Sequence, residues 1–107
     1  MNKKDFLRQP TWKEWLILKK ISICNNTDPV HKKNWAHRIK ANSFNPTFYN
    51  ALNLMLAYDI ATQKAGIGKS IIFTVDIKKL DIFIENSDIY KEFKNYVYKK
   101  ELFIMGV

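Results

Sequence analysis

The apolar residues near the start of the chain follow a pattern that predicts a buried helix. Thr11 is followed three residues later by Glu14, the spacing of a capping box, in which each side chain bonds the backbone N–H of the other residue. Apolar residues then occupy almost every side of a helix over residues 12–24. Because isoleucines flank Ser22 on both sides, a strand over 15–24 remains the alternative.

Two proline-containing signals predict the next helices. In Asp28-Pro29 and in Asn45-Pro46, a side chain that caps helices precedes a proline whose fixed backbone suits the first helical position. The first signal predicts a helix over 29–42. The second predicts the longest helix of the chain, from its proline to about residue 65, with Gly66 ending it.

The last third of the chain predicts one strand and two further helices. Residues 70–75 are β-branched and aromatic, which favours a strand, whereas 76–85 and a segment that begins at Ser87 have helical spacing. A second short extended segment is expected at 102–105. The fold class is therefore mainly α, a single compact domain of about five helices with short β elements near 70–75 and 102–105.

The length and the charge of the chain limit the number of domains and the kind of partner. With 107 residues there is room for one domain, over 11–107, after a polar lead-in over 1–10. The formal charge is +8, and residues 1–40 hold ten of the 18 Lys and Arg but only three of the ten acids. Positive charge that is concentrated in one part of a chain points to a polyanionic partner, and we expect nucleic acid, DNA in preference to RNA, or an acidic surface of a protein partner. A solvated surface without a partner remains the alternative.

The candidate binding residues lie in the first two predicted helices. The helix over 29–42 has only Trp35 and Ile39 as its apolar stripe, so most of its surface faces solvent or a partner. Lysine contacts phosphate as a point charge, so we expect the phosphate backbone to dominate affinity. The residues expected to contact nucleic acid or another partner are Lys13, Lys19, Lys20, Lys32, Lys33, Asn34, His37, Arg38, Lys40 and Asn42.

A helix-turn-helix is the most specific DNA-binding arrangement that the sequence offers. The helices over 29–42 and 46–65 are joined by a short turn, Ser43-Phe44-Asn45. In such motifs the second helix needs a polar face for the major groove, but residues 46–65 are apolar on nearly all sides. We therefore favour an ordinary antiparallel helix pair and keep groove reading as the alternative.

Asp59 falls among apolar residues of the longest predicted helix. It shares a helical face with Phe48, Leu52 and Met55. Since a buried carboxylate is costly without a partner, we expect it to be paired. Its role, as an internal ion pair or as a partner contact, is left open.

Catalytic and metal chemistry have little support. Gln63–Ser70 ends like a phosphate-binding P-loop, but it lacks the first glycine and leads from a helix toward a strand. His31 and His37 are six residues apart, so they cannot share a helix face as metal ligands do. With Cys24 as the lone cysteine, an intramolecular disulfide is also excluded. We expect no cofactor, no metal and no enzymatic activity.

The expected function is that of a small regulatory or accessory nucleic-acid-binding protein of phage or mobile-element origin. The alternative is an inhibitor or adaptor of the anti-defence type that docks onto a larger nucleic-acid-processing enzyme, because Trp and Tyr often dominate protein interfaces. Neither a secretory signal nor an apolar run long enough to cross a bilayer is present, so a cytoplasmic location without a membrane partner is expected. The oligomeric state is left open.

Overall fold

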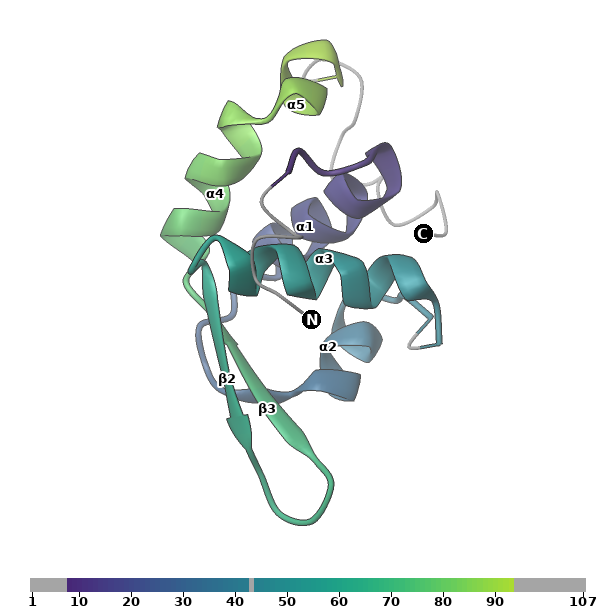
Figure 1. Ribbon diagram of the computed structural model, residues 1–107, viewed down its shortest axis with the longest axis vertical. Helices are drawn as coiled ribbons and strands as arrows, with labels where there is room; N and C mark the ends of the chain where they lie inside the picture. Colours follow the sequence, from purple (N-terminus) through teal and green to yellow (C-terminus); the bar gives the residue numbers. More distant parts are fainter. Residues whose placement is uncertain (1–7, 43, 94–107) are drawn as a thin grey trace.

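The computed structural model of the protein describes residues 8–42 and 44–93 (Figure 1). Helices form most of this part of the chain, and three strands form one antiparallel sheet. In chain order the elements are α1 (Trp12–Cys24), β1 (Val30–His31), α2 (Lys32–Arg38), α3 (Pro46–Ala57), β2 (Ala61–Ala65), β3 (Ile71–Val75), α4 (Ile77–Asn86) and α5 (Asp88–Phe93).

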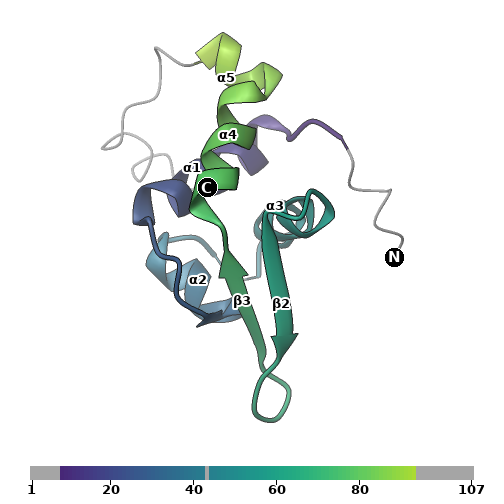
Figure 2. The same cartoon turned by 90° about the vertical axis from the view of Figure 1, so that its left-hand side faces the viewer.

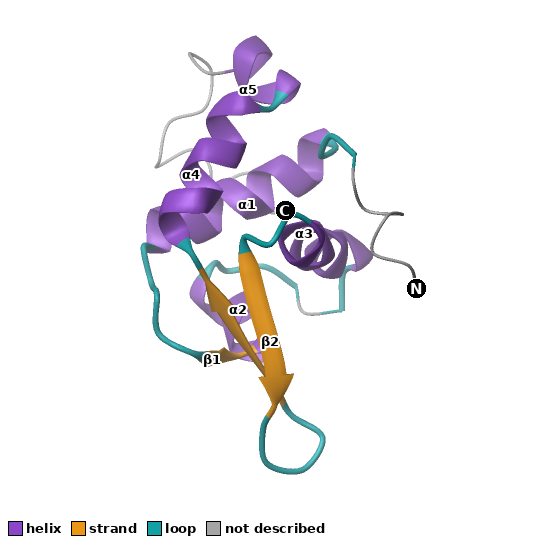
Figure 3. Ribbon diagram, turned by 60° about the vertical axis from the view of Figure 1, so that its left-hand side comes forward, coloured by secondary structure: helices purple, strands orange, loops and turns teal. Residues whose placement is uncertain are grey.

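The sheet has the order β1-β3-β2, with β3 in the middle. Phe73 of β3 lies opposite Val30 of β1 on one side and opposite Gln63 of β2 on the other. β2 and β3 form a hairpin that extends away from the helices (Figure 3). The expectation of a mainly α domain is therefore wrong, because the described part of the chain is mixed α/β.

The first helix agrees with its sequence signals. The backbone N–H of Glu14 donates to the Thr11 hydroxyl (3.3 Å), and the Thr11 N–H donates to the Glu14 carboxylate (2.9 Å). This capping box is the predicted one, and the helix excludes the alternative of a strand over 15–24. α1 packs against α3 and α4, and the Ser22 hydroxyl donates a hydrogen bond to the Asp81 carboxylate on α4.

The second helix is shorter than the predicted 29–42. Val30 is extended and buried because it pairs with Phe73, about forty residues later in the chain, so the helix begins only at Lys32. The helix ends where Lys40 adopts a left-handed backbone with φ 55°. The N–H groups of Lys40 and Ala41 bond carbonyls of the last turn, which is a Schellman ending.

The third helix begins at the predicted position, where the Asn45 side chain accepts a hydrogen bond from the Thr47 N–H. It ends at Ala57 and not near residue 65, because Asp59 is left-handed with φ 59°. The Ile60 N–H bonds the Met55 carbonyl at 2.8 Å, again in a Schellman ending. Asp59 is exposed at this turn, so the expectation that it is buried on a helix face is wrong.

The segment after this turn reverses as a hairpin. Residues 61–65, predicted as helix, form β2, and they pair with β3, the strand that the sequence predicted near 70–75. α4 follows with the Asp76 side chain as its N-cap, in agreement with the prediction for 76–85. α5 lies in the segment predicted as the last helix, and the expected extended segment at 102–105 lies outside the described residues.

α3 separates two groups of elements (Figures 1 and 2). α1, α4 and α5 lie on one side of it, and α2 and the hairpin lie on the other. The core contains large side chains from both groups and from α3, including Trp15, Trp35, Phe48 and Phe73, all at most 1% exposed. Within residues 8–42 and 44–93, no helix is long and apolar enough to cross a bilayer.

Candidate nucleic-acid interface

An open hollow of about 450 Å³ lies between the first turn of α2, the N-terminal part of α3 and the loop of the β2–β3 hairpin. We call it the basic hollow. Lysine side chains enter it from α2 and from the hairpin, and none of the described residues that line it carries a carboxylate. Its lining residues are His31, Lys32, Lys33, Asn34, Tyr49, Lys69, Ser70 and Ile71.

Lys32 links the three elements that form the basic hollow. Its Nζ donates a hydrogen bond of 3.3 Å to Oε1 of Gln63 on β2. The same atom lies 5.7 Å from the ring centre of Tyr49 on α3 and 5.9 Å from that of Phe73 on β3, within the range of cation–π attraction. Burial lowers the pKa of the Lys32 ammonium. An anion that enters the hollow would therefore meet a cation whose position is already fixed.

α2 is anchored by its inner face, which leaves its outer face available. Trp35 is fully buried, and its Nε1 donates a hydrogen bond of 3.0 Å to the carbonyl of Phe73. Ile39 and Ala36 are buried beside it, so the narrow apolar stripe that the sequence showed is the packing face. The exposed residues of the helix can contact a partner without disturbing this packing.

The structure brings together only some of the candidate binding residues. Lys32, Lys33 and Asn34 line the basic hollow. His37 and Arg38 are exposed farther along α2, and the Arg38 carbonyl accepts a hydrogen bond from Cys24 Sγ at the end of α1 (3.6 Å).

Two further candidates lie just after α2 and shape the turn toward α3. The exposed Lys40 holds the left-handed position that ends α2. Oδ1 of the exposed Asn42 accepts a hydrogen bond from the Phe44 N–H (2.9 Å). The backbone of Lys40 and the side chain of Asn42 therefore stabilise the chain just after α2. The Lys40 side chain is exposed.

The lysines of α1 lie apart from the basic hollow. Lys13 is exposed and Lys19 half-buried, but α1 is on the other side of α3 from the hairpin (Figure 1). Lys20 is fully buried, and burial lowers the pKa of its ammonium. This is a correction to the expectation that Lys20 is a surface contact. Because α1 has buried residues on several of its sides, one of its lysines, Lys20, lies in the interior.

Sequence reasoning missed the contribution of the hairpin and of α3. Lys69 and Ser70 line the basic hollow from the hairpin loop, and Tyr49 lines it from α3. The available signal was the pair of lysines at 64 and 69 around two glycines, immediately before the predicted strand. The sequence predicts a helix over residues 61–65, and this prediction hides the basic hairpin.

α3 carries a narrow polar strip beside the basic hollow. Asn50 and Asn53 are half-buried and follow Tyr49 at helical spacing, so the three share the outer face of the helix. The other faces of α3 are buried against the core, including α1. α3, the helix that follows α2 in the chain, thus has a polar strip on its outer face, and the hairpin follows α3 directly.

Carboxylates as well as lysines line a second hollow at the opposite end of the hairpin. A second open hollow, of about 550 Å³, lies where the hairpin meets α4, and Asp59, Asp76 and Asp81 line it together with Lys78 and Lys79. Three carboxylates thus line the hollow at one end of the hairpin. The described residues that line the basic hollow, at the other end, include no carboxylate. The described lining residues of the two hollows therefore differ in charge.

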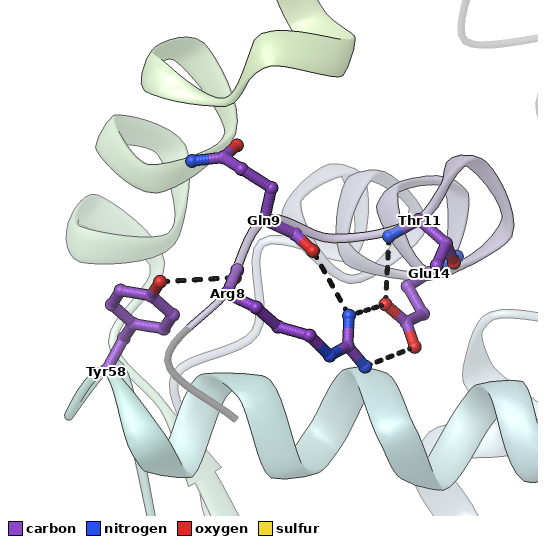
Figure 4. Close-up of polar contacts among 5 residues, drawn as sticks. All are labelled: Arg8, Gln9, Thr11, Glu14 and Tyr58. Atoms are coloured by element: carbon purple, nitrogen blue, oxygen red, sulfur yellow. Dashed lines mark hydrogen bonds and ion pairs between the residues drawn. The ribbon is translucent and has the colours of Figure 1, made fainter. Parts of the chain in front are cut away.

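Arg8, the cation next to the described start of the chain, is engaged within the protein (Figure 4). Its guanidinium donates two hydrogen bonds, of 2.7 and 2.8 Å, to the two carboxylate oxygens of Glu14. The Tyr58 hydroxyl donates to the Arg8 carbonyl at 3.1 Å. These contacts fix the segment before α1, so Arg8 has a structural role.

The described residues hold no cluster suited to a metal ion, that is, no group of three or more His, Cys, Asp or Glu side chains in suitable positions. Comparison with known proteins gives no relative: no family model matches the chain, and neither a curated protein nor a solved structure is similar to it. The function must therefore be argued from the geometry of the basic hollow and its neighbours.

Proposed function

We propose that this protein binds double-stranded DNA through the face that carries the basic hollow, the polar strip of α3 and the β2–β3 hairpin. We call this the binding face. The observation that carries the proposal is the convergence of Lys32, Lys33 and Lys69, from two separate elements, on one open hollow. Clustered lysines on a concave surface attract phosphates and account for sequence-independent affinity.

We propose that α2 and α3, which follow one another in the chain, act as a helix-turn-helix, which favours duplex DNA over other polyanions. In DNA-binding proteins with this motif, the second helix enters the major groove and the first crosses the backbone. α3 would present Asn50 and Asn53 to base edges, and an asparagine amide can bond adenine bidentately. A helix fits the major groove of B-form DNA, whereas the deep, narrow major groove of A-form RNA does not admit side chains.

We further propose a regulatory or accessory role in the cytoplasm. The binding face offers contacts to DNA, and the proposal assigns no catalysis to the chain. The lone Cys24 would be a reduced thiol in that compartment.

The test measures duplex binding as a function of salt concentration. We expect Lys33→Glu and Lys69→Glu each to lower the affinity and to reduce the slope of log affinity against log salt by about one. Lys78→Glu is the control, because it makes the same charge change at an exposed position of α4 near the carboxylates. Asn53→Ala should reduce discrimination between sequences more than it reduces binding to generic duplex.

Two results would overturn the proposal. One is a wild-type protein with no salt-dependent affinity for duplex DNA. The other is a Lys78→Glu variant that loses as much affinity as Lys33→Glu, because binding would then follow net charge and not this face. Capture of a nuclease-resistant protein complex without duplex binding would instead favour an inhibitor or adaptor.

A further inference from the structure

The loop of the β2–β3 hairpin holds an isoleucine in solvent. Ile67 is 95% exposed, compared with 59% for Ile82 on α4. The loop lies at the far end of the hairpin from the helices (Figures 1 and 2). An aliphatic side chain in this position contributes nothing to the core of the chain.

Hydrogen bonds within the loop fix the backbone at Ile67. The Gly66 N–H donates to the Ser70 carbonyl (2.9 Å), which closes the loop beyond the strands. The Ile67 carbonyl accepts hydrogen bonds from both the N–H and the hydroxyl of Ser70, at 3.4 and 2.6 Å. Gly68 has φ +67°, a left-handed conformation that glycine adopts freely. The position of Ile67 is therefore set by bonds within the loop.

The surroundings of Ile67 are cationic. Lys69 follows it in the same loop and lines the basic hollow, and Lys64 is exposed near the end of β2. A partner for this loop must combine anionic edges with an apolar interior. The minor groove of DNA has this chemistry where a base step opens, because phosphates flank the groove and the faces of the bases are apolar.

The length of the hairpin fits this placement. β2 has five residues, and at about 3.4 Å per residue it spans about 17 Å. Half of a DNA helical turn is also about 17 Å, so a hairpin beside a helix in the major groove reaches the next minor groove.

We propose that Ile67 inserts into the minor groove as an apolar wedge and bends the DNA. The inference rests on the proposed function, since it requires duplex binding by the same face. Proteins that insert isoleucine, leucine or phenylalanine between base steps kink the duplex by about 20–90°. Pyrimidine–purine steps such as TA unstack most easily, so the bend should be largest when a TA step lies under the hairpin.

The experiment compares bending and affinity for the full chain on a duplex of about 30 base pairs with fluorescent dyes at its ends. Energy transfer between the dyes should rise when the wild type binds, because the ends approach. Ile67→Ala should still bind but lose this rise, and Ile67→Leu should keep it. Ile82→Ala, which removes an exposed isoleucine from α4, should bend the duplex like the wild type. Ile67 is exposed, so its variants should melt at the wild-type temperature.

The outcomes separate this inference from the proposed function. Equal bending by wild type and Ile67→Ala, or no bending by either, overturns the wedge while salt-dependent binding leaves the proposed function intact. Failure of the wild type to bind any duplex overturns both. Anionic lipid vesicles are tested in parallel: vesicle binding that depends on Ile67, together with an unbent duplex, would assign the loop to a membrane and overturn the wedge.

Discussion

The indole Nε1 of Trp35 donates a hydrogen bond of 3.0 Å to the carbonyl oxygen of Phe73. It joins α2 to the middle strand of the sheet, and the two residues are 38 positions apart in the chain. Trp15 of α1 is buried to nearly the same extent, but its Nε1 has no hydrogen-bond partner among the described residues. The two tryptophans therefore differ in the hydrogen bonding of their indole N–H groups more than in burial.

This difference predicts unequal costs for the same substitution. Trp35→Phe would leave the Phe73 carbonyl without its indole donor, whereas Trp15→Phe would remove a polar group that has no described partner. We expect Trp35→Phe to lower the free energy of unfolding by about 1 kcal/mol more than Trp15→Phe, the net contribution of one hydrogen bond. Urea denaturation at pH 7 measures both. Equal losses, or a larger loss for Trp15→Phe, would contradict the assigned role of the bond.

The Arg8–Glu14 pair predicts a pH-dependent contribution to stability. Burial alone would raise the pKa of Glu14, but hydrogen bonds from Arg8 and Thr11 outweigh it and hold the pKa below its ordinary value near 4.5. The folded state therefore binds this proton less readily than the unfolded state does. The contribution is present above pH 4.5 and is lost as the pH falls through the lower, folded value.

Glu14→Gln tests this contribution, because glutamine keeps the shape without the charge. The wild type should be more stable than Glu14→Gln at pH 7, and the difference should shrink as the pH falls below about 4.5. Urea denaturation at several pH values measures it. Glu85→Gln on the exposed side of α4 serves as the matched control. A difference that stays constant down to pH 3 would show that the charge of Glu14 does not contribute.

Local signals in the sequence were sufficient to predict those elements that depend on residues close together in the chain. The capping box of Thr11 and Glu14, the Asn45-Pro46 start and the β-branched residues of β3 all predicted elements that the structure contains. Contacts between distant residues were not predictable in this way. The extended conformation of Val30 depends on its pairing with Phe73, and the residues near Val30 in the sequence do not predict that pairing.

The candidate site shows the same limit. Charge alone identified Lys32 and Lys33, because they stand on a helix with only a narrow apolar stripe. Lys69 and Tyr49 join them only after the hairpin folds back, and the sequence interpretation had continued the helix through β2. The burial of Lys20 also depends on packing around α1, which charge counting cannot detect.

The hairpin loop predicts a coupling between Gly66 and Ser70. A Cβ at position 66 would lie 2.6 Å from the Ser70 hydroxyl oxygen, which itself bonds the Ile67 carbonyl. Gly66→Ala must therefore displace that hydroxyl and break its bond, at a cost of about 1 kcal/mol. The cost should be smaller in a Ser70→Ala background, where the bond is already absent.

A four-variant cycle of unfolding free energies measures this coupling. Gly68→Ala is the control, because a Cβ there meets no atom within 4 Å and its penalty comes from the φ of +67° alone. That penalty should not depend on Ser70. Independent, additive costs for Gly66→Ala and Ser70→Ala would contradict the close approach.

The end of α3 predicts an order of stability between two substitutions at Asp59. Asp59 is exposed with φ 59°, a conformation that glycine adopts at no steric cost and that costs alanine about 1–2 kcal/mol. We therefore expect Asp59→Gly to be more stable than Asp59→Ala by about 1 kcal/mol, measured by thermal and urea unfolding. At Asp28, which is exposed and not among the described residues of positive φ, the order should reverse, because glycine only adds freedom to the unfolded chain. If Asp59→Ala proved as stable as Asp59→Gly, the left-handed ending of α3 would be wrong, and a longer helix would again have to be considered.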